Sequence, residues 1–240
     1  MLNKLSIFMP HIIRLIYKKI KTSYLQKKWS HNSDRRVIDW NWEKTNFNRI
    51  AAVSLLTNKF KNPSYLEIGC DTNFLFNSIA SSKKIGVDPC SGGNVKMTSD
   101  EFFKSNKTKF DVVFIDGLHT YEQVRRDVIN AIRFLNPGGW IGLHDMLPSD
   151  WIEQHVPNIS MGPWTADGWK VAFELKETEG IEFKILKIDK GVGIIKLNED
   201  NVNLKDFRDQ LIQKKYSYYY DNLKNLPIYD WEDAQEWLRS

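Results

Sequence analysis

The feature that most constrains the fold is the alternation of short apolar runs with helical patterns from residue 63 to about residue 198. Strands that alternate with helices predict a parallel sheet. Two late apolar runs, separated by Asp189-Lys190-Gly191, predict a β-hairpin that adds antiparallel pairing. We therefore expect an α/β fold with a doubly wound, mostly parallel sheet. The predicted strands cover residues 65–68, 85–87, 112–115, 140–143, 181–188 and 192–197.

The helix expected between the third and fourth strands carries its own boundary signals. Thr120 and Gln123 resemble a capping box, and apolar residues then recur at helical spacing. Asn136-Pro137-Gly138-Gly139 is expected to stop this helix. Along the chain we predict a helical, basic N-terminal segment (1–60), an α/β domain (61–200) and a helical, aromatic C-terminal tail (201–240) that covers the core or a subunit partner.

Composition narrows the functional classes. Two cysteines, neither in a CxxC pair, argue against a disulfide framework or a zinc site and favour a reducing cytoplasm. Nine of the 34 Lys and Arg residues lie in positions 1–36 against a single Asp34, so the remaining chain is slightly acidic. A basic catalytic face for nucleic acid is therefore not expected.

The basic N-terminal segment has helical periodicity at residues 9–28. Its apolar residues fall on one side, with Arg14, Lys18 and Lys21 largely on the other. One interpretation is peripheral contact with the inner, anionic face of a membrane. The alternative is packing on the domain or on a second subunit in a homo-oligomer. No run is long enough to span a bilayer, and no secretory cleavage signal is recognised. The apolar positions are Met9, Ile13, Ile16, Tyr17, Ile20 and Tyr24.

A nucleoside site is predicted at the ends of the first two strands. The first strand leads into Glu67-Ile68-Gly69-Cys70-Asp71 and a helix from about Asn73. A glycine turn before a helix is where an open α/β sheet binds its ligand. Asp88 follows the second strand at a spacing typical of a carboxylate that binds ribose hydroxyls.

The residues of this turn favour S-adenosylmethionine (SAM) over NAD. NAD requires a second and third glycine near its pyrophosphate, and this chain has Asp71-Thr72-Asn73-Phe74 there. SAM has no pyrophosphate. The acidic Glu67 suits its ammonium and sulfonium. The predicted cofactor-binding residues are Glu67, Gly69, Cys70, Asp71, Asp88 and Asp116.

A second set of polar residues follows the next two strands. Asp116 ends one strand and His144-Asp145 ends its expected neighbour, so their side chains should converge beside the cofactor. Methyl transfer to a hydroxyl is an in-line displacement that needs alignment and removal of a proton. His119, three residues after the strand, is a candidate general base because histidine changes charge near neutral pH. The alternative is that His119 orders the loop.

Residues 110–145 carry the most specific motifs. FDVVFIDGLHTYEQVRRDVINAIRFLNPGGWIGLHD closely resembles class I methyltransferases of the group called methyltransferase family 24, with IDGxHxY, a PGG turn and a strand ending in HD. The resemblance extends over about residues 65–197. It implies a Rossmann-like fold with a seven-stranded sheet, and a SAM-dependent methyltransferase of the EC 2.1.1 type. Its best-matched positions are Asp116, Gly117, His119, Tyr121, Asp127, Gly138, Gly139, His144 and Asp145. The first glycine loop, GCDTN, is poorer in glycine than most members.

Similarity to metal-dependent sugar and catechol O-methyltransferases implies a divalent ion held by Asp116, His144 and Asp145. Oxygen ligands suit Mg²⁺, whereas a histidine ligand favours Mn²⁺ or Zn²⁺. Catalysis by the same side chains without a metal is the alternative. The loop at 151–169 is expected to form an aromatic lid over a small-molecule or glycan acceptor, or to wedge onto the core. Candidate acceptor contacts are Trp164, Asp167, Trp169 and Lys170, the last three in a segment that resembles the family's DxWK motif.

The predicted function is O-methylation of a hydroxyl on a sugar or small metabolite. Asp116, His119, His144 and Asp145 are the predicted catalytic residues. Two alternatives remain from the sequence: a non-catalytic SAM-binding or assembly module, and a metal-dependent hydrolase or hydroxylase that uses the same His/Asp cluster.

Overall fold

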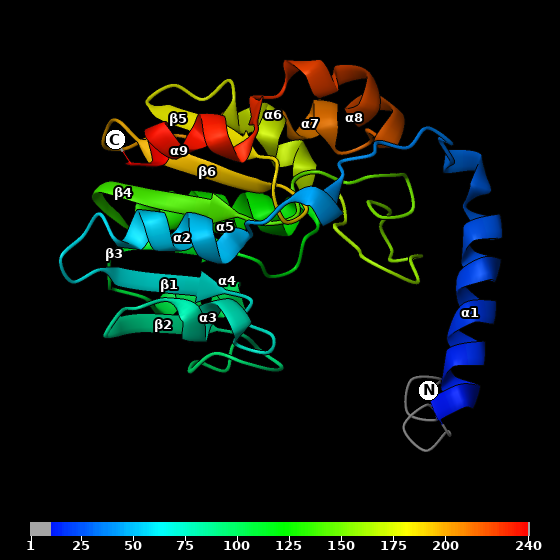
Figure 1. Cartoon of the computed structure of the whole chain (residues 1–240), viewed down its shortest axis with the longest axis horizontal. Helices are drawn as coiled ribbons and strands as arrows, with labels where there is room; N and C mark the ends of the chain where they lie inside the picture. Colours follow the sequence, from blue (N-terminus) through cyan, green and yellow to red (C-terminus); the bar gives the residue numbers. More distant parts are fainter. Residues whose placement is uncertain (1–10, 240) are drawn as a thin grey trace.

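A seven-stranded sheet forms the centre of the protein, with helices on both faces (Figure 1). The computed structural model describes residues 11–239. The order across the sheet is β2-β1-β3-β4-β6-β5-β7. The strands are β1 (Ser64–Ile68), β2 (Lys83–Val87), β3 (Phe110–Ile115), β4 (Leu135–Leu143), β5 (Ile181–Leu186), β6 (Val192–Leu197) and β7 (Ile228–Tyr229).

The directions of the strands confirm the predicted fold class. Strands β2, β1, β3 and β4 are parallel neighbours, whereas β6 is antiparallel to both β4 and β5. The β5–β6 hairpin therefore extends a parallel sheet, as expected. The short β7 pairs in parallel with β5 at the edge. Because parallel strands point the same way, the carboxyl ends of β1, β2, β3 and β4 share one edge of the sheet.

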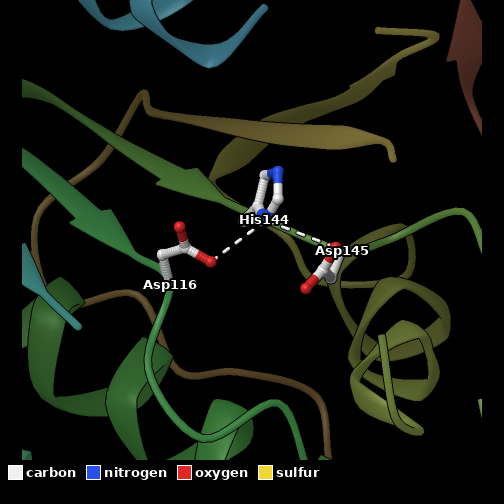
Figure 2. Close-up of side chains that lie close together, drawn as sticks. All are labelled: Asp116, His144 and Asp145. Atoms are coloured by element: carbon white, nitrogen blue, oxygen red, sulfur yellow. Dashed lines mark ion pairs between the residues drawn. The ribbon is translucent and has the colours of Figure 1, made fainter. Parts of the chain in front are cut away.

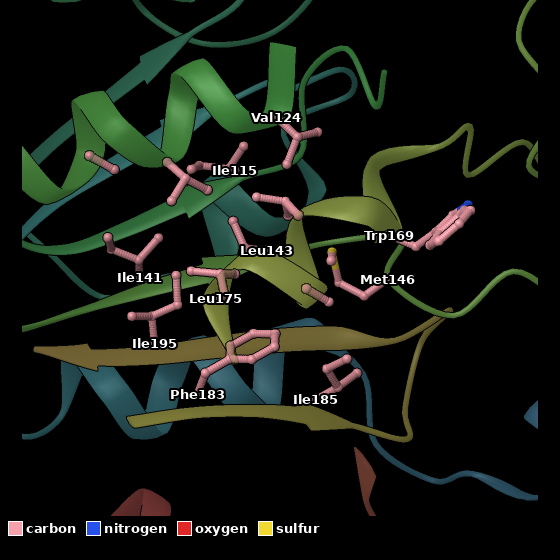
Figure 3. Packing of buried hydrophobic residues seen from close by; sticks show 14 of the residues in the cluster. Ile115, Val124, Ile141, Leu143, Met146, Trp169, Leu175, Phe183, Ile185 and Ile195 are labelled. Atoms are coloured by element: carbon pink, nitrogen blue, oxygen red, sulfur yellow. The ribbon is translucent and has the colours of Figure 1, made fainter. Parts of the chain in front are cut away.

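Helices cover each face of the sheet and bury a separate apolar cluster there. One face packs against α2, α3 and α9, and the other against α4, α5, α6, α7 and α8. Ile141 and Ile195, on neighbouring strands, lie in the second cluster (Figure 3). The helices are α1 (His11–Lys28), α2 (Arg49–Thr57), α3 (Phe74–Ser78), α4 (Ser99–Ser105), α5 (Tyr121–Arg133), α6 (Val171–Leu175), α7 (Arg208–Leu211), α8 (Tyr216–Asn222) and α9 (Trp231–Arg239). Short 3₁₀ turns lie at Ser30–Asn32, Trp42–Lys44, Gly168–Lys170 and Leu223–Asn225.

Both predicted flanking segments contribute to the core of the domain. Ala52, Val53 and Leu56 of α2, within the predicted N-terminal segment, are fully buried against the sheet. In the C-terminal tail, Tyr216 and Tyr219 of α8 are fully buried. The tail is helical, as predicted, and also supplies β7, which the sequence did not predict.

The start of α5 differs from the predicted capping box. Thr120 is the N-cap residue, but its side chain makes no capping hydrogen bond. The side chain of Gln123 instead donates to Ser99 and Asp127. The carboxylate of Asp167, distant in sequence, accepts the hydrogen bond from the backbone N–H of Tyr121. A tertiary contact thus replaces the local cap.

Helix α1 stands apart from the sheet and its covering helices (Figure 1). It confirms the helix predicted from periodicity, except that the part of that prediction at Met9 lies outside the described residues. Among residues 11–239, no helix combines the length and hydropathy needed to cross a membrane.

Candidate active site

The turn after β1 approaches the end of β3 so closely that only glycine fits. Gly69 has φ +83°, and a Cβ on it would lie 2.2 Å from the backbone oxygen of Asp116. Its N–H donates to the carbonyl of Val87 at 2.8 Å, which ties the turn to β2 as well. Gly69 therefore brings the predicted cofactor turn into contact with the start of the predicted catalytic loop.

Asp88 holds this turn through its two carboxylate oxygens. Oδ2 accepts hydrogen bonds from the N–H groups of Cys70 and Asp71, each at 3.0 Å. Oδ1 accepts from those of Cys90 and Ser91, each at 2.8 Å. Burial raises the pKa of Asp88, but these four backbone hydrogen bonds outweigh burial and bring the pKa below its ordinary value. The group therefore stays ionised. The carboxylate that the sequence predicts to bind ribose therefore connects the loop after β1 with the loop after β2.

Glu67 points into the same region from β1. Its Oε2 accepts a hydrogen bond of 2.5 Å from the hydroxyl of Tyr65, and the residue is 2% exposed. Burial raises the pKa of Glu67 to about 7, since the hydrogen bond from Tyr65 offsets only part of the desolvation. A buried carboxyl of this kind has a strong preference for a cationic neighbour.

A single cavity of about 600 Å³ connects the two predicted parts of the site. At one end it is lined by Glu67, Gly69 and Asp88, and at the other by Asp116 and His119. Its volume lies within the range of small-molecule and cofactor sites. The predicted cofactor-binding and catalytic residues therefore face one shared space.

Three of the predicted catalytic residues, Asp116, His144 and Asp145, converge at the ends of β3 and β4 (Figure 2). Nδ1 of His144 lies 3.0 Å from Oδ1 of Asp116 and 3.3 Å from Oδ1 of Asp145. Nε2 of His119 lies 3.3 Å from Oδ2 of Asp145. Asp145 has φ +61°, a left-handed conformation that is unfavourable for a non-glycine residue and is often found at functional sites.

Opposite charges in this cluster stabilise one another and shift the pKa values of His144 and Asp145. Burial lowers the pKa of His144, but the neighbouring Asp116 and Asp145 outweigh this and raise the pKa well above its ordinary value. The pKa of Asp145 is lowered, because His144, His119 and Arg49 together overcome the effect of burial. In this arrangement Asp145 is ionised, and the positive charges of His144 and Arg49 lie nearby.

Arg49 and Asp189 also belong to the site, although the sequence does not predict a functional role for either residue. Nη1 of Arg49 donates to Oδ2 of Asp189 at 2.8 Å and lies 3.2 Å from Nε2 of His144. Nε of Arg49 lies 3.6 Å from Oδ2 of Asp116. Arg49 begins α2, and Asp189 lies in the turn between β5 and β6, where it was interpreted only as a turn residue. No local motif marks either residue, because only the packing of α2 beside that turn brings them to the cluster.

Asp116, His144 and Asp145 offer the donor set of a metal site. One ligand atom from each residue lies within 4.8 Å of the others. Nδ1 of His144 is buried between the carboxylates of Asp116 and Asp145, with which it forms ion pairs. A divalent cation would replace the proton on this nitrogen, and an imidazole ligand favours Mn²⁺ or Zn²⁺ over Mg²⁺.

None of the four predicted acceptor contacts, at Trp164, Asp167, Trp169 and Lys170, lines the cavity. Trp169 is fully buried and packs against Tyr219 at a ring distance of 5.0 Å. Lys170 is 3% exposed, and its ammonium donates to Asp167 and to the carbonyl of Ile212. The expectation that Trp169 and Lys170 contact an acceptor is therefore wrong, because both are enclosed by the core.

Trp164 is the one aromatic residue of these four candidates that lies beside the catalytic cluster. Its ring makes an edge contact with His119 at 6.3 Å, and its Nε1 donates to the carbonyl of His155 at 2.8 Å. The half-buried Trp164 thus stands next to the predicted general base, and its contact with an acceptor stays a prediction.

We expect Asp167→Ala to lower the free energy of unfolding by about 3 kcal/mol, because it leaves Lys170 as an unpaired buried charge and removes the α5 cap. Lys170→Met should cost less than about 1 kcal/mol, because an apolar side chain of similar size suits that position. The double variant Asp167→Ala/Lys170→Met should recover most of the lost stability. Urea unfolding measures all three. A stable Asp167→Ala protein with impaired turnover would instead assign Asp167 to the acceptor.

Solved structures of known proteins have a similar fold. Rv0187 from MTB, in a cofactor-bound crystal structure, is 14% identical, with coverage of 76% of this chain and 90% of that chain and a TM-score of 0.50. An O-methyltransferase from Bacillus cereus in complex with SAH is 14% identical, covers 79% and 93%, and has a TM-score of 0.45. SAH-bound PaMTH1, a methyltransferase from Podospora anserina, is 16% identical, covers 75% and 96%, and has a TM-score of 0.43. At these identities the likeness concerns the fold. No curated protein matches the chain.

The sheet order, the glycine turn and the His/Asp cluster define a protein of the class I methyltransferase fold. Residues 66–146 match the family model described as a methyltransferase domain. This segment contains Gly69, Asp88, Asp116, His144 and Asp145. This match confirms the resemblance that the motifs of the segment indicated.

Proposed function

We propose that the chain is a SAM-dependent methyltransferase that methylates a hydroxyl group of a sugar or another small acceptor. The observation that carries this proposal is the single cavity that joins the Gly69 turn to the cluster of Asp116, His119, His144 and Asp145. A cofactor at the turn and an acceptor at the cluster would meet within it. Such proximity is the main requirement of a displacement between two bound molecules.

The charge of the cavity lining fits SAM. Carboxylates outnumber the single guanidinium of Arg49, so the lining attracts a cation and disfavours a pyrophosphate. The acidic residues that line it are Glu67, Asp71, Asp88, Asp116 and Asp145. SAM supplies a methyl group on a positively charged sulfur. We assign Glu67 to the cationic part of the cofactor and the Gly69 turn to close backbone approach.

The cluster at the other end of the cavity can prepare a hydroxyl for attack. We assign His119 as the base that accepts the hydroxyl proton at Nδ1, the ring nitrogen that does not face Asp145. The carboxylate of Asp145, 3.3 Å from Nε2, holds the proton of the neutral ring on Nε2 and stabilises the resulting imidazolium. We assign Asp116 and the buried His144 to orient the acceptor in the cavity. Trp164 beside His119 offers an apolar surface on which a sugar face can pack.

A divalent metal fits the same cluster. Asp116, His144 and Asp145 would hold it, and it would supply Lewis-acid stabilisation of an acceptor alkoxide. Arg49 stands beside the same carboxylates and provides a fixed positive charge there. The roles of His119 and Asp145 in proton transfer are the same whether the metal or Arg49 provides the positive charge.

The function is tested by incubating the full chain with methyl-labelled SAM and a panel of sugar, catechol and small-metabolite acceptors, with and without Mg²⁺, Mn²⁺ and Zn²⁺. We expect label transfer to a hydroxyl oxygen of at least one acceptor. SAM binding by calorimetry without transfer under any condition would indicate a binding or assembly module. Turnover of an ester that requires metal and ignores SAM would indicate a hydrolase.

SAM affinity is expected to rise by roughly 10-fold from pH 6 to pH 8, provided the bound cation favours ionised Glu67. The free protein holds this carboxyl partly protonated, since burial raises its pKa to about 7. A cationic ligand lowers that pKa, so binding releases a proton and strengthens as pH rises. Calorimetry in two buffers of different ionisation enthalpy measures the released proton. Glu67→Gln should abolish this release; an unchanged release would assign the proton to another group.

A further inference from the structure

Helix α1 contacts the rest of the protein through a narrow side. Thr22 is 7% exposed, and the side chain of Gln26 donates to the carbonyl of Ile159 at 2.9 Å. Just beyond the helix, the ring of Trp29 lies 5.3 Å from that of His155. These contacts anchor the C-terminal half of α1 on the loop that follows β4. They also determine which side of the helix faces away from the protein.

The side that faces away is apolar. Successive helical residues are rotated by about 100°, so Ile20 lies nearly opposite the buried Thr22. Ile13, Ile16 and Tyr24 fall on the same side as Ile20. Their exposed fractions are 48% for Ile13, 54% for Ile16, 64% for Ile20 and 66% for Tyr24. Within the described residues, this stripe has no apolar partner in the fold, and contiguous exposed apolar surface of this kind marks an interaction site.

Positive charges surround the apolar stripe. Helix α1 contains no Asp or Glu. Lys19 lies on one flank of the stripe, and Arg14 and Lys21 lie on the other. Each of the basic residues is exposed, and together they are Arg14, Lys18, Lys19, Lys21, Lys27 and Lys28. An apolar face with basic flanks is the arrangement of helices that lie in the interface of an anionic bilayer.

We propose that α1 docks this protein on an anionic lipid surface, with Ile13, Ile16, Ile20 and Tyr24 inserted among the acyl chains. Charge decides between this occupant and a second copy of the chain. Two copies of α1 packed through the same stripe would bring basic flanks of like sign together. Lipid phosphates instead neutralise those flanks, and lysine stems can extend along the apolar face toward the headgroups.

The location of α1 relates this surface to the active site. In Figure 1 the helix stands on the side of the molecule toward which β1 points, and this is the edge where Asp116 and Asp145 lie. Docking through α1 would therefore bring the edge of the sheet that carries the cavity toward the lipid surface, rather than the opposite edge.

The test is co-sedimentation of the full chain with vesicles of phosphatidylcholine alone or of phosphatidylcholine with phosphatidylglycerol. We expect binding to the anionic vesicles that weakens as salt rises, and little binding to the neutral ones. Arg14→Gln/Lys19→Gln/Lys21→Gln, which removes the charges on both flanks, should weaken it by roughly 100-fold. Ile16→Ser/Ile20→Ser should weaken it by roughly 10-fold or more.

The matched control is Lys104→Gln/Lys107→Gln/Lys109→Gln, which removes three exposed lysines elsewhere and should change vesicle affinity by less than about twofold. Thermal unfolding should be unchanged in all variants, since the altered side chains are exposed. Absence of binding to anionic vesicles would overturn the proposal. So would an equal effect of the control variant, or an α1-dependent dimer in sedimentation equilibrium without vesicle binding.

Discussion

Replacement of Asp145 by asparagine is expected to reduce methyl transfer by roughly 10³-fold while SAM affinity changes by less than about threefold. The carboxylate of Asp145 lies 3.3 Å from both His119 Nε2 and His144 Nδ1. An amide of the same shape removes the charge that stabilises a protonated His119. It also weakens any metal held at the cluster, so the loss falls on the chemical step in either mechanism.

Asp116→Asn is expected to act in the same way, because Asp116 is the second carboxylate on His144. Single-turnover rates and calorimetry with SAM separate the chemical step from binding. Asp209→Asn, an exposed carboxylate on α7, is the matched control and should leave both unchanged. A full rate of methyl transfer in Asp145→Asn would show that the cluster takes no part in the chemical step. A large loss of SAM affinity would instead show that Asp145 binds the cofactor.

Asp88→Ala is expected to lower the free energy of unfolding by about 3 kcal/mol and to weaken SAM binding by roughly 100-fold. The substitution leaves four N–H groups, at Cys70, Asp71, Cys90 and Ser91, without their acceptor. The turn at Gly69 would then lose its support, so the cofactor site would be disordered as well as missing a carboxylate.

Asp88→Asn is the informative companion to this variant. Its amide keeps the shape and one oxygen but places an NH₂ group against two N–H donors, so we expect roughly half of the loss in stability. Urea unfolding and SAM calorimetry on both variants give the comparison. If SAM affinity falls while stability does not, Asp88 binds the ribose without bracing the loops, contrary to the hydrogen bonds described above.

Local patterns were sufficient to predict much of the sheet and part of the site. The apolar runs of β1, β3 and β4 are continuous because both faces of the sheet are covered, so the sequence marks these strands clearly. A parallel sheet brings strand ends to one edge whatever the details of packing. For that reason the convergence of Gly69, Asp88, Asp116 and Asp145 followed from their positions in the chain.

Contacts between distant parts of the chain decided the rest. The sequence by itself determined the alternation of strands and helices and the polar residues at the strand ends, because periodicity and turn chemistry act over a few residues. Only the tertiary structure brought Arg49 and Asp189 to His144 and moved Asp167 to the start of α5. Only the tertiary structure enclosed Trp169 in the core, since burial depends on what the rest of the chain packs around a side chain.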